Sequence, residues 1–182
     1  KIDDYSYLYE YTKFLNIAFF VPGNAKIIFT ENDKQAINEI FEKTFNPLEK
    51  IIYNIKDKDY IIKLIKNNPV ANFTNKKNTY INCYSKNLNN LTIEIESPVD
   101  GFLILTDNFD PGWAVKIDNK DDKIFEAYLC FKSVFLKKGK HIVEFDYKPF
   151  IINIGIIISV IILIFFISYA IYNLNLKKKY EN

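Results

Sequence analysis

The chain has 182 residues, of which 49% are hydrophobic and 16% are aromatic, so it is not a wholly disordered polypeptide. Its 24 basic residues, all of them lysine, nearly balance 22 acidic ones, and the net charge of +2 gives no electrostatic basis for binding nucleic acid. Because the first residue is not Met and the opening residues lack the pattern of a signal peptide, we expect the chain to be a piece of a longer protein.

Residues 1–66 predict a small α/β lead-in segment. The runs AFFV and AKIIFT, on either side of a Pro-Gly pair, are typical of a strand, a turn and a second strand. Apolar residues then recur at helical spacing and predict one helix near 32–45, with Thr30 or Asn32 as its N-cap. The run KIIYNI after this helix predicts a third strand.

Residues 67–149 predict an antiparallel β-sandwich domain, because polar and apolar residues alternate with a period of two between turn signals. The run GFLILTDNF is almost continuously apolar, as expected of a strand that is covered on both faces. After an Asp-Pro-Gly turn, Trp113, Val115 and Ile117 fall on one face of the next strand. The run DNKD that follows is typical of a hairpin.

Residues 150–172 predict a transmembrane helix, because none of them is charged. At about 1.5 Å per residue this helix is roughly 35 Å long, enough to cross a hydrocarbon layer of about 30 Å. The tail, 173–182, contains lysines at 177–179, and the positive-inside rule then places the tail in the cytoplasm and the β-domain on the extracytoplasmic face of the plasma membrane. The predicted fold is therefore mainly β, an antiparallel β-sandwich with a small α/β lead-in and one C-terminal transmembrane helix.

The residue types indicate no catalytic, cofactor or metal site within this chain. His141 is the single histidine, so neither a metal cluster nor a Ser-His-Asp or Cys-His arrangement is expected. No Gly-rich phosphate-binding loop is present. Cys83 and Cys130 leave two possibilities open, one disulfide or two free thiols.

The Asp-Pro-Gly turn is the best candidate for a binding site. Asp107 and Asp110 lie three residues apart and could converge as an acid and a base or bind sugar hydroxyls. An Asp in front of a Pro-Gly turn also commonly caps the turn backbone with its own side chain. Trp113 is either a plug of the sandwich core or an aromatic platform for a sugar ring, and the sequence leaves both readings open.

These motifs, in this order, resemble the C-terminal end of the YfhO-type bacterial membrane proteins. The resemblance covers roughly 15–162 and depends on a D-x-x-x-PGW turn, an Ala-Tyr pair and a G-x-H-x-V-x-F-x-Y-x-P strand that enters a membrane helix. The matching residues are Asp107, Pro111, Gly112, Trp113, Ala127, Tyr128, Gly139, His141, Val143, Phe145, Tyr147 and Pro149. One departure is the hairpin at 119–121, which lacks the glycine of the family pattern and leaves the turn type open.

The resemblance implies a polytopic parent protein similar to the GT-C glycosyltransferases, which use polyprenyl-phosphate-linked sugars to modify cell-envelope glycans. The catalytic carboxylates of such enzymes lie among N-terminal membrane helices, so no catalytic residue is carried over and this chain alone should be inactive. The expected partners are the lipid bilayer, the rest of the parent protein and a glycan or lipid-linked sugar. The candidate glycan-contacting residues are Asp107, Asp110, Trp113 and Tyr128.

Two other functions compete with that of an accessory glycosyltransferase domain. The first is a non-enzymatic carbohydrate-binding or adhesion module on a single-helix anchor, which predicts an exposed aromatic patch. The second is a purely structural assembly domain, which predicts a wholly buried Trp113 and a sandwich without a groove.

Overall fold

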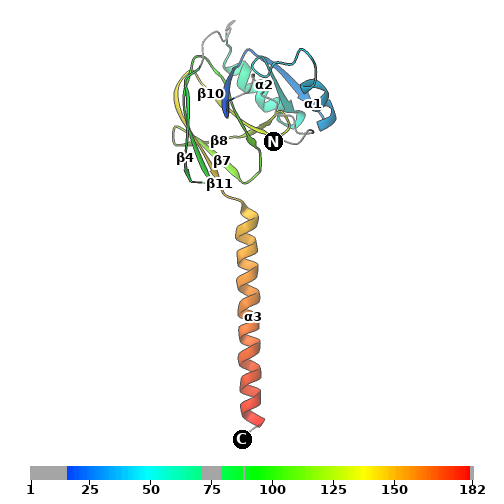
Figure 1. Cartoon of the computed structure of the whole chain (residues 1–182), viewed down its shortest axis with the longest axis vertical. Helices are drawn as coiled ribbons and strands as arrows, with labels where there is room; N and C mark the ends of the chain where they lie inside the picture. The colour runs from blue at the N-terminus through cyan, green and yellow to red at the C-terminus, as the bar shows by residue number, and fades with distance from the viewer. Residues whose placement is uncertain (1–15, 71–78, 88, 181–182) are drawn as a thin grey trace, which may run out of the picture.

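The computed structural model describes residues 16–70, 79–87 and 89–180, in which the strands form two sheets above one long helix (Figure 1). The large sheet has the strand order β1 (Ala18–Pro22), β6 (Gly101–Asn108), β10 (Phe131–Leu136), β9 (Phe125–Ala127), β3 (Lys50–Asn54), β2 (Lys26–Thr30). The small sheet has the order β4 (Ile81–Asn87), β5 (Asn90–Ser97), β11 (Gly139–Tyr147), β7 (Trp113–Ile117), β8 (Lys120–Asp122). Neighbouring strands are antiparallel except for the parallel pair β2 and β3.

The two sheets bury a common core between them, which confirms the predicted mainly β, sandwich-like fold. The large sheet contributes β1, β6 and β10 side chains, and the small sheet contributes β5, β7 and β11 side chains. Val134 from one sheet and Val143 from the other are both completely buried. The strand period of two therefore places apolar residues on the facing surfaces of both sheets.

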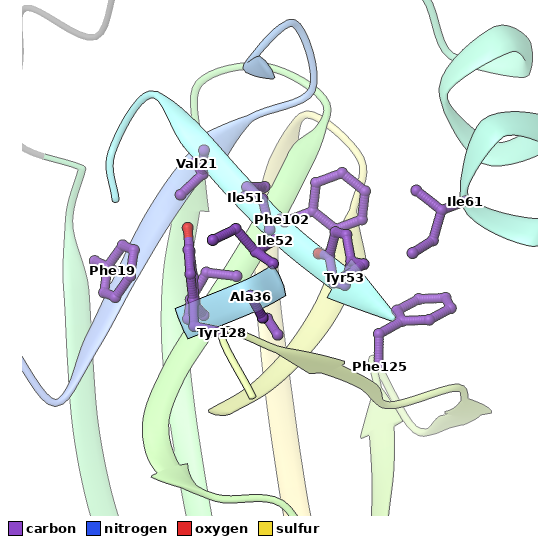
Figure 2. Close-up of a cluster of buried hydrophobic side chains, with 12 residues drawn as sticks. Phe19, Val21, Ala36, Ile51, Ile52, Tyr53, Ile61, Phe102, Phe125 and Tyr128 are labelled. Carbon is purple, nitrogen blue, oxygen red and sulfur yellow. The ribbon is translucent and has the colours of Figure 1, made fainter. Parts of the chain in front are cut away.

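A second core lies on the opposite face of the large sheet, where two helices cover it (Figure 2). Helix α1 (Asp33–Ile40) contributes Ala36, and helix α2 (Lys58–Asn67), which follows a short 3₁₀ turn at Ile55–Asp57, contributes Ile61. Strand β6 lies between the two cores, so its four residues 102–105 are all fully buried. This confirms the prediction that the continuous apolar run GFLIL is covered on both faces.

Helix α1 is shorter than the predicted helix near 32–45. It begins after Asn32, whose side-chain oxygen accepts a hydrogen bond from the Gln35 amide at 3.0 Å, so the cap is Asn32 rather than Thr30. It ends at Ile40, and the chain then turns so that the Phe45 ring packs edge-on against the Tyr128 ring with the centroids 6.0 Å apart.

Helix α2 was not among the predicted elements, which included only one helix in residues 1–66. The predicted boundary at residue 66 is also crossed by the large sheet, because β1 pairs with β6 and β3 pairs with β9. Strands β1 and β2 lie at opposite edges of this sheet although only residues 23–25 join them. A link of that length reaches roughly 14 Å, so the sheet curls until its two edges approach each other.

Helix α3 (Phe150–Tyr180) leaves the end of β11 and extends away from both sheets (Figure 1). Within the described residues, α3 alone is long and apolar enough to cross a membrane, over Ile154–Tyr172 with a mean hydropathy of 2.9. The helix continues through the lysines of the predicted tail. The Ser159 hydroxyl donates to the Gly155 carbonyl at 2.8 Å, so this polar group is satisfied inside the helix. Residues 1–15 of the lead-in and 181–182 of the tail lie outside the described residues.

Candidate functional site

The Asp-Pro-Gly turn is held together by its own aspartate. The Asp110 carboxylate accepts a hydrogen bond from the Gly112 amide at 2.7 Å, and the Trp113 amide donates to the Asp110 carbonyl at 3.0 Å. A Cβ atom at Gly112 would lie 2.9 Å from the Asp110 carboxylate and 3.0 Å from the Pro149 Cα, so glycine is required by close approach. Asp110 therefore caps the turn, which is the structural alternative raised by the sequence.

The same turn is hydrogen-bonded to the segment that joins the β-domain to α3. The Lys148 amide donates to the Gly112 carbonyl at 2.7 Å. Trp113 lies opposite Tyr147 in the β7–β11 ladder, and their ring centroids are 5.0 Å apart. Burial, followed by the charge of Asp110 and a hydrogen bond with it, raises the pKa of Tyr147. The turn thus sits at the end of the sandwich nearest α3.

A buried lysine completes this end of the domain. The Lys132 side chain is 0% exposed, and its ammonium donates to the Asp107 carboxylate at 2.6 Å and to the Asn108 carbonyl at 3.1 Å. The ammonium also lies 3.7 Å from the centroid of the Trp113 ring. Burial lowers the pKa of Lys132, while Asp107 and, more weakly, Asp110 oppose the shift. We call Asp107, Asp110, Trp113, Lys132 and Tyr147 the membrane-proximal cluster.

Lys132 was not among the site residues predicted from the sequence. A signal was available, because Lys132 alternates with Val134 and Leu136 on a strand whose apolar residues face the inter-sheet core. A lysine on such a face is either ion-paired or displaced, since an unpaired buried ammonium is very costly. The cluster therefore contains a cation, Lys132, in addition to the predicted residues Asp107, Asp110 and Trp113.

Trp113 combines features of both readings that the sequence left open. Its side chain packs against the inter-sheet core together with Val115 and Ile117, as the strand period predicted. It remains partly exposed, so the wholly buried tryptophan expected of a purely structural domain is not observed. One face of the indole is covered by Lys132, which holds the ring in place.

The two candidate carboxylates are both engaged within the chain. The Asp110 carboxylate accepts a hydrogen bond from the Gly112 amide. The Asp107 carboxylate accepts hydrogen bonds from the Lys132 ammonium and, at 2.8 Å, from the Asn108 amide. The Asp107 side chain is nevertheless 51% exposed, so it still has room to accept hydrogen bonds from a ligand. An exposed acceptor beside a partly exposed indole is suited to binding a polyol.

Tyr128 lies away from this cluster, in the second core between the large sheet and α1 (Figure 2). It is 6% exposed, and its hydroxyl lies 2.8 Å from the carbonyl oxygens of both Pro47 and Lys50, its two possible acceptors. Burial raises its pKa. A ring enclosed in this way is not accessible to a glycan, so we assign Tyr128 a structural role.

Two grooves lie on the outer side of the small sheet. The larger has a volume of about 440 Å³ and includes the exposed side chains of Tyr80 and Ile142, and the smaller has about 260 Å³ and includes Lys116 and Lys148. A purely structural domain predicts a sandwich without a groove, and these two grooves do not agree with that expectation. The 61% exposed Tyr80 ring also gives the larger groove an aromatic surface.

Asp118, in the hairpin between β7 and β8, lines the larger groove. Asp118 and Asn119 have φ values of 51° and 65°, which is the pattern of a type I′ turn and replaces the glycine of the family motif. The Asp118 carboxylate lies 2.7 Å from His141 Nδ1 and accepts from the Ile142 amide at 3.0 Å. Although burial opposes the shift, the Ile142 amide and the His141 ring hold the pKa of Asp118 below its usual value.

The cysteines and potential metal ligands add no further site. Cys83 and Cys130 are free thiols, and burial raises the pKa of each. Among the described residues, no group of three His, Cys, Asp or Glu side chains is placed to hold a metal ion.

Comparison with known proteins gives the family. The model of the family described as "Bacterial membrane protein YfhO" matches residues 56–159, which is more than half of the chain. The protein named "Uncharacterized protein YfhO" from Bacillus subtilis (strain 168) is 31% identical over 83 residues, or 46% of this chain. The chain covers only 10% of the length of that relative. No solved structure matches the chain. Together with the D-x-x-x-PGW turn and the strand that runs into α3, these matches show that the chain belongs to the YfhO family of bacterial membrane proteins.

Proposed function

We propose that this chain is the extracytoplasmic accessory domain and last membrane helix of a polytopic, GT-C-like glycosyltransferase. The parent enzyme would take a polyprenyl-phosphate-linked sugar and transfer it to a cell-envelope glycan. The chain covers about a tenth of the length of the Bacillus subtilis relative. Within this proposal, the catalytic groups belong to the remainder of the parent protein. The role of this domain is to cover the membrane-embedded site or to orient the acceptor.

The observation that carries this proposal is the rigid junction between the β-domain and α3. Only Lys148 and Pro149 separate the end of β11 from the first residue of α3. The Lys148 amide also donates a hydrogen bond to the Gly112 carbonyl of the turn. A domain with so short and bonded a connection is held at a constant height above the membrane. That geometry suits work on a substrate anchored in the same membrane, whereas an adhesion module benefits from a long, flexible stalk.

The glycan-contacting role within this proposal falls on two of the four candidate residues. Asp107 and Trp113 retain exposed surface at the membrane-proximal end of the domain, where a lipid-linked sugar would be presented. Asp110 is exposed as well, but its carboxylate is taken up by capping the turn. A carboxylate acceptor beside an aromatic ring matches the hydroxyl groups and the C–H face of a pyranose.

An insertion in the full-length parent protein tests the junction. We expect about ten Gly and Ser residues inserted after Pro149 to release the domain from its constant height. Sugar incorporation into envelope glycans should then be lost, while protein abundance in the membrane is unchanged. The same insertion between Asn119 and Lys120, in the exposed hairpin, is the matched control and should preserve incorporation. Normal incorporation with the insertion after Pro149 would contradict the proposal.

The orientation across the membrane can be tested with a native thiol. Cys130 is exposed on the β-domain, and Lys178→Cys introduces a thiol beyond the membrane span. In a parent protein without other reactive cysteines, a membrane-impermeant maleimide added to intact cells should label Cys130 but not a thiol at position 178. The reverse pattern would place the β-domain in the cytoplasm.

A second function, a non-enzymatic carbohydrate-binding module, is favoured by the groove of about 440 Å³ with its exposed Tyr80 ring. In that case the isolated 182-residue chain should bind envelope glycans, and Tyr80→Ala should weaken this binding. The insertion after Pro149 should leave it unchanged, which distinguishes this function from the first.

A further inference from the structure

The end of the β-domain next to α3 presents two aromatic rings in contact, and a lysine follows the second of them in the chain. Trp113 begins β7 and Tyr147 ends β11, and the two lie opposite each other with both rings partly exposed. Lys148 follows directly, and its side chain is 74% exposed while it pairs with Asp146. Tryptophan, tyrosine and lysine are the side chains that concentrate at the interface between membrane and water.

The distance from these residues to the hydrocarbon layer follows from the chain itself. The uncharged run begins at Phe150, three residues after Tyr147, so the Tyr147 backbone lies at most about 10 Å above the start of that run. A headgroup layer is roughly 5–8 Å thick on each side of the membrane. The side chains of Trp113 and Tyr147 are therefore within reach of lipid headgroups.

The position of the indole is held from inside the domain. The Lys132 ammonium lies 3.7 Å from the ring centroid on the buried side, and Asp107 holds that ammonium in turn. The Lys148 amide donates a hydrogen bond to the Gly112 carbonyl, which ties the turn to the segment that leads into α3. The exposed part of Trp113 thus keeps one height and one orientation with respect to the membrane.

We infer that Trp113, Tyr147 and Lys148 form a contact surface for lipid headgroups, so that the β-domain rests on the bilayer surface next to α3. The apolar rings of Trp113 and Tyr147 enter the headgroup layer, and their polar N–H and O–H groups meet water and lipid oxygens. Lys148 faces the phosphates of anionic lipids. This surface does not depend on sugar transfer by the parent protein, nor on which side of the membrane the β-domain lies.

The test uses the only tryptophan of the chain as a depth probe. The unchanged 182-residue chain is reconstituted into vesicles of phosphatidylethanolamine and phosphatidylglycerol that carry a nitroxide either on the headgroup or deep in the acyl chain. Trp113 emission should be quenched at least about twofold more strongly by the headgroup nitroxide than by the deep one, because indole rings prefer the interface. Soluble iodide should quench it less in vesicles than after transfer to detergent.

Each other result overturns the inference. Stronger quenching by the deep nitroxide would place Trp113 in the hydrocarbon layer, and quenching by iodide alone would place it in water, away from lipid. The matched control is the double variant Trp113→Phe with Tyr80→Trp, checked for folding by circular dichroism. Tyr80 lines the groove beside His141, which is six residues before Tyr147 in β11 and so about 20 Å farther from the membrane. A tryptophan there should respond to iodide and to neither nitroxide.

Discussion

Replacing the buried Lys132 and replacing its half-exposed partner Asp107 should have very unequal effects on stability. Asp107→Asn removes the negative charge but leaves the ammonium in a site where its side chain is 0% exposed. Breaking a fully buried pair from one side costs about 3–5 kcal/mol. Asp107 is 51% exposed and the Asn108 carbonyl still accepts from the ammonium, so we expect the free energy of unfolding to fall by a smaller amount. About 2 kcal/mol is a reasonable magnitude for one lost charge-assisted hydrogen bond.

The opposite replacement, Lys132→Met, should change the free energy of unfolding by less than about 1 kcal/mol. It leaves Asp107 half exposed to water, where a carboxylate is well solvated, and it fills the buried volume with an apolar side chain of similar length. The hydrogen bonds and the contact with the Trp113 ring are lost, but so is the cost of burying an ammonium. The two effects nearly cancel.

The effect of pH follows from the lowered pKa of Lys132. Because the folded state holds this proton less tightly than the unfolded state, the charged ammonium reduces stability at low pH. The reduction disappears as the pH rises from the folded pKa toward the unfolded value of about 10.4. Asp107→Asn removes an interaction that raises the pKa, so the pKa should fall further. The stability deficit of Asp107→Asn relative to the unchanged chain should therefore shrink between neutral and alkaline pH.

Urea unfolding of the chain in detergent, followed by circular dichroism, measures all three proteins. With a slope of about 2 kcal/mol per molar urea, the midpoint of Asp107→Asn should fall by roughly 1 M and that of Lys132→Met by less than half of this. A midpoint for Lys132→Met that is as low as that of Asp107→Asn would refute the reasoning, because the ion pair would then be net stabilising rather than a charge that needs a partner.

Three further predictions concern stability in the same assay. Gly112→Ala should cost about 1–3 kcal/mol, because its Cβ would lie 2.9 Å from the Asp110 carboxylate. The comparison Gly155→Ala has nothing within 4 Å and lies inside a helix, so it should not lower the midpoint. A midpoint for Gly112→Ala equal to that of the unchanged chain would show that the turn can relax. Tyr128→Phe should cost about 1–2 kcal/mol through the lost hydroxyl hydrogen bond, and an unchanged midpoint would mean that water replaces the phenol. Asn32→Ala should cost about 1 kcal/mol by removing the cap of α1, and Asn32→Asp, which keeps the acceptor, should not.

Much of the fold followed from local patterns in the sequence. The continuous apolar run in β6 predicted a strand covered on both faces, and residues 102–105 are buried between two cores. The period of two predicted that Trp113, Val115 and Ile117 face the same core. The missed helix α2 also had a local signal, since Ile61, Leu64 and Ile65 recur at helical spacing.

The arrangement of the strands in space was harder to predict. Strand β3 pairs with β9 through Tyr53 and Ala127, which are 74 residues apart in the chain, so the lead-in and the predicted sandwich share one sheet. A strand pattern specifies which side chains point inward, but it contains no information about which distant strand lies alongside. Tyr128 shows the consequence, because a residue chosen as a glycan contact from the motif is enclosed by α1 and the large sheet.

The sequence by itself determined the uncharged helix, the lysine-rich end and the inward face of β7, because each depends on residues a few positions apart. Only the tertiary structure revealed that Lys132 lies buried beneath Trp113 and that the turn accepts a hydrogen bond from Lys148, two residues before α3. These features join β6, β7, β10 and β11, and the free energy of a buried charge depends on the groups that the fold brings around it. The chemistry at the membrane-proximal end is therefore a property of the assembled sheets, to which each strand contributes one part.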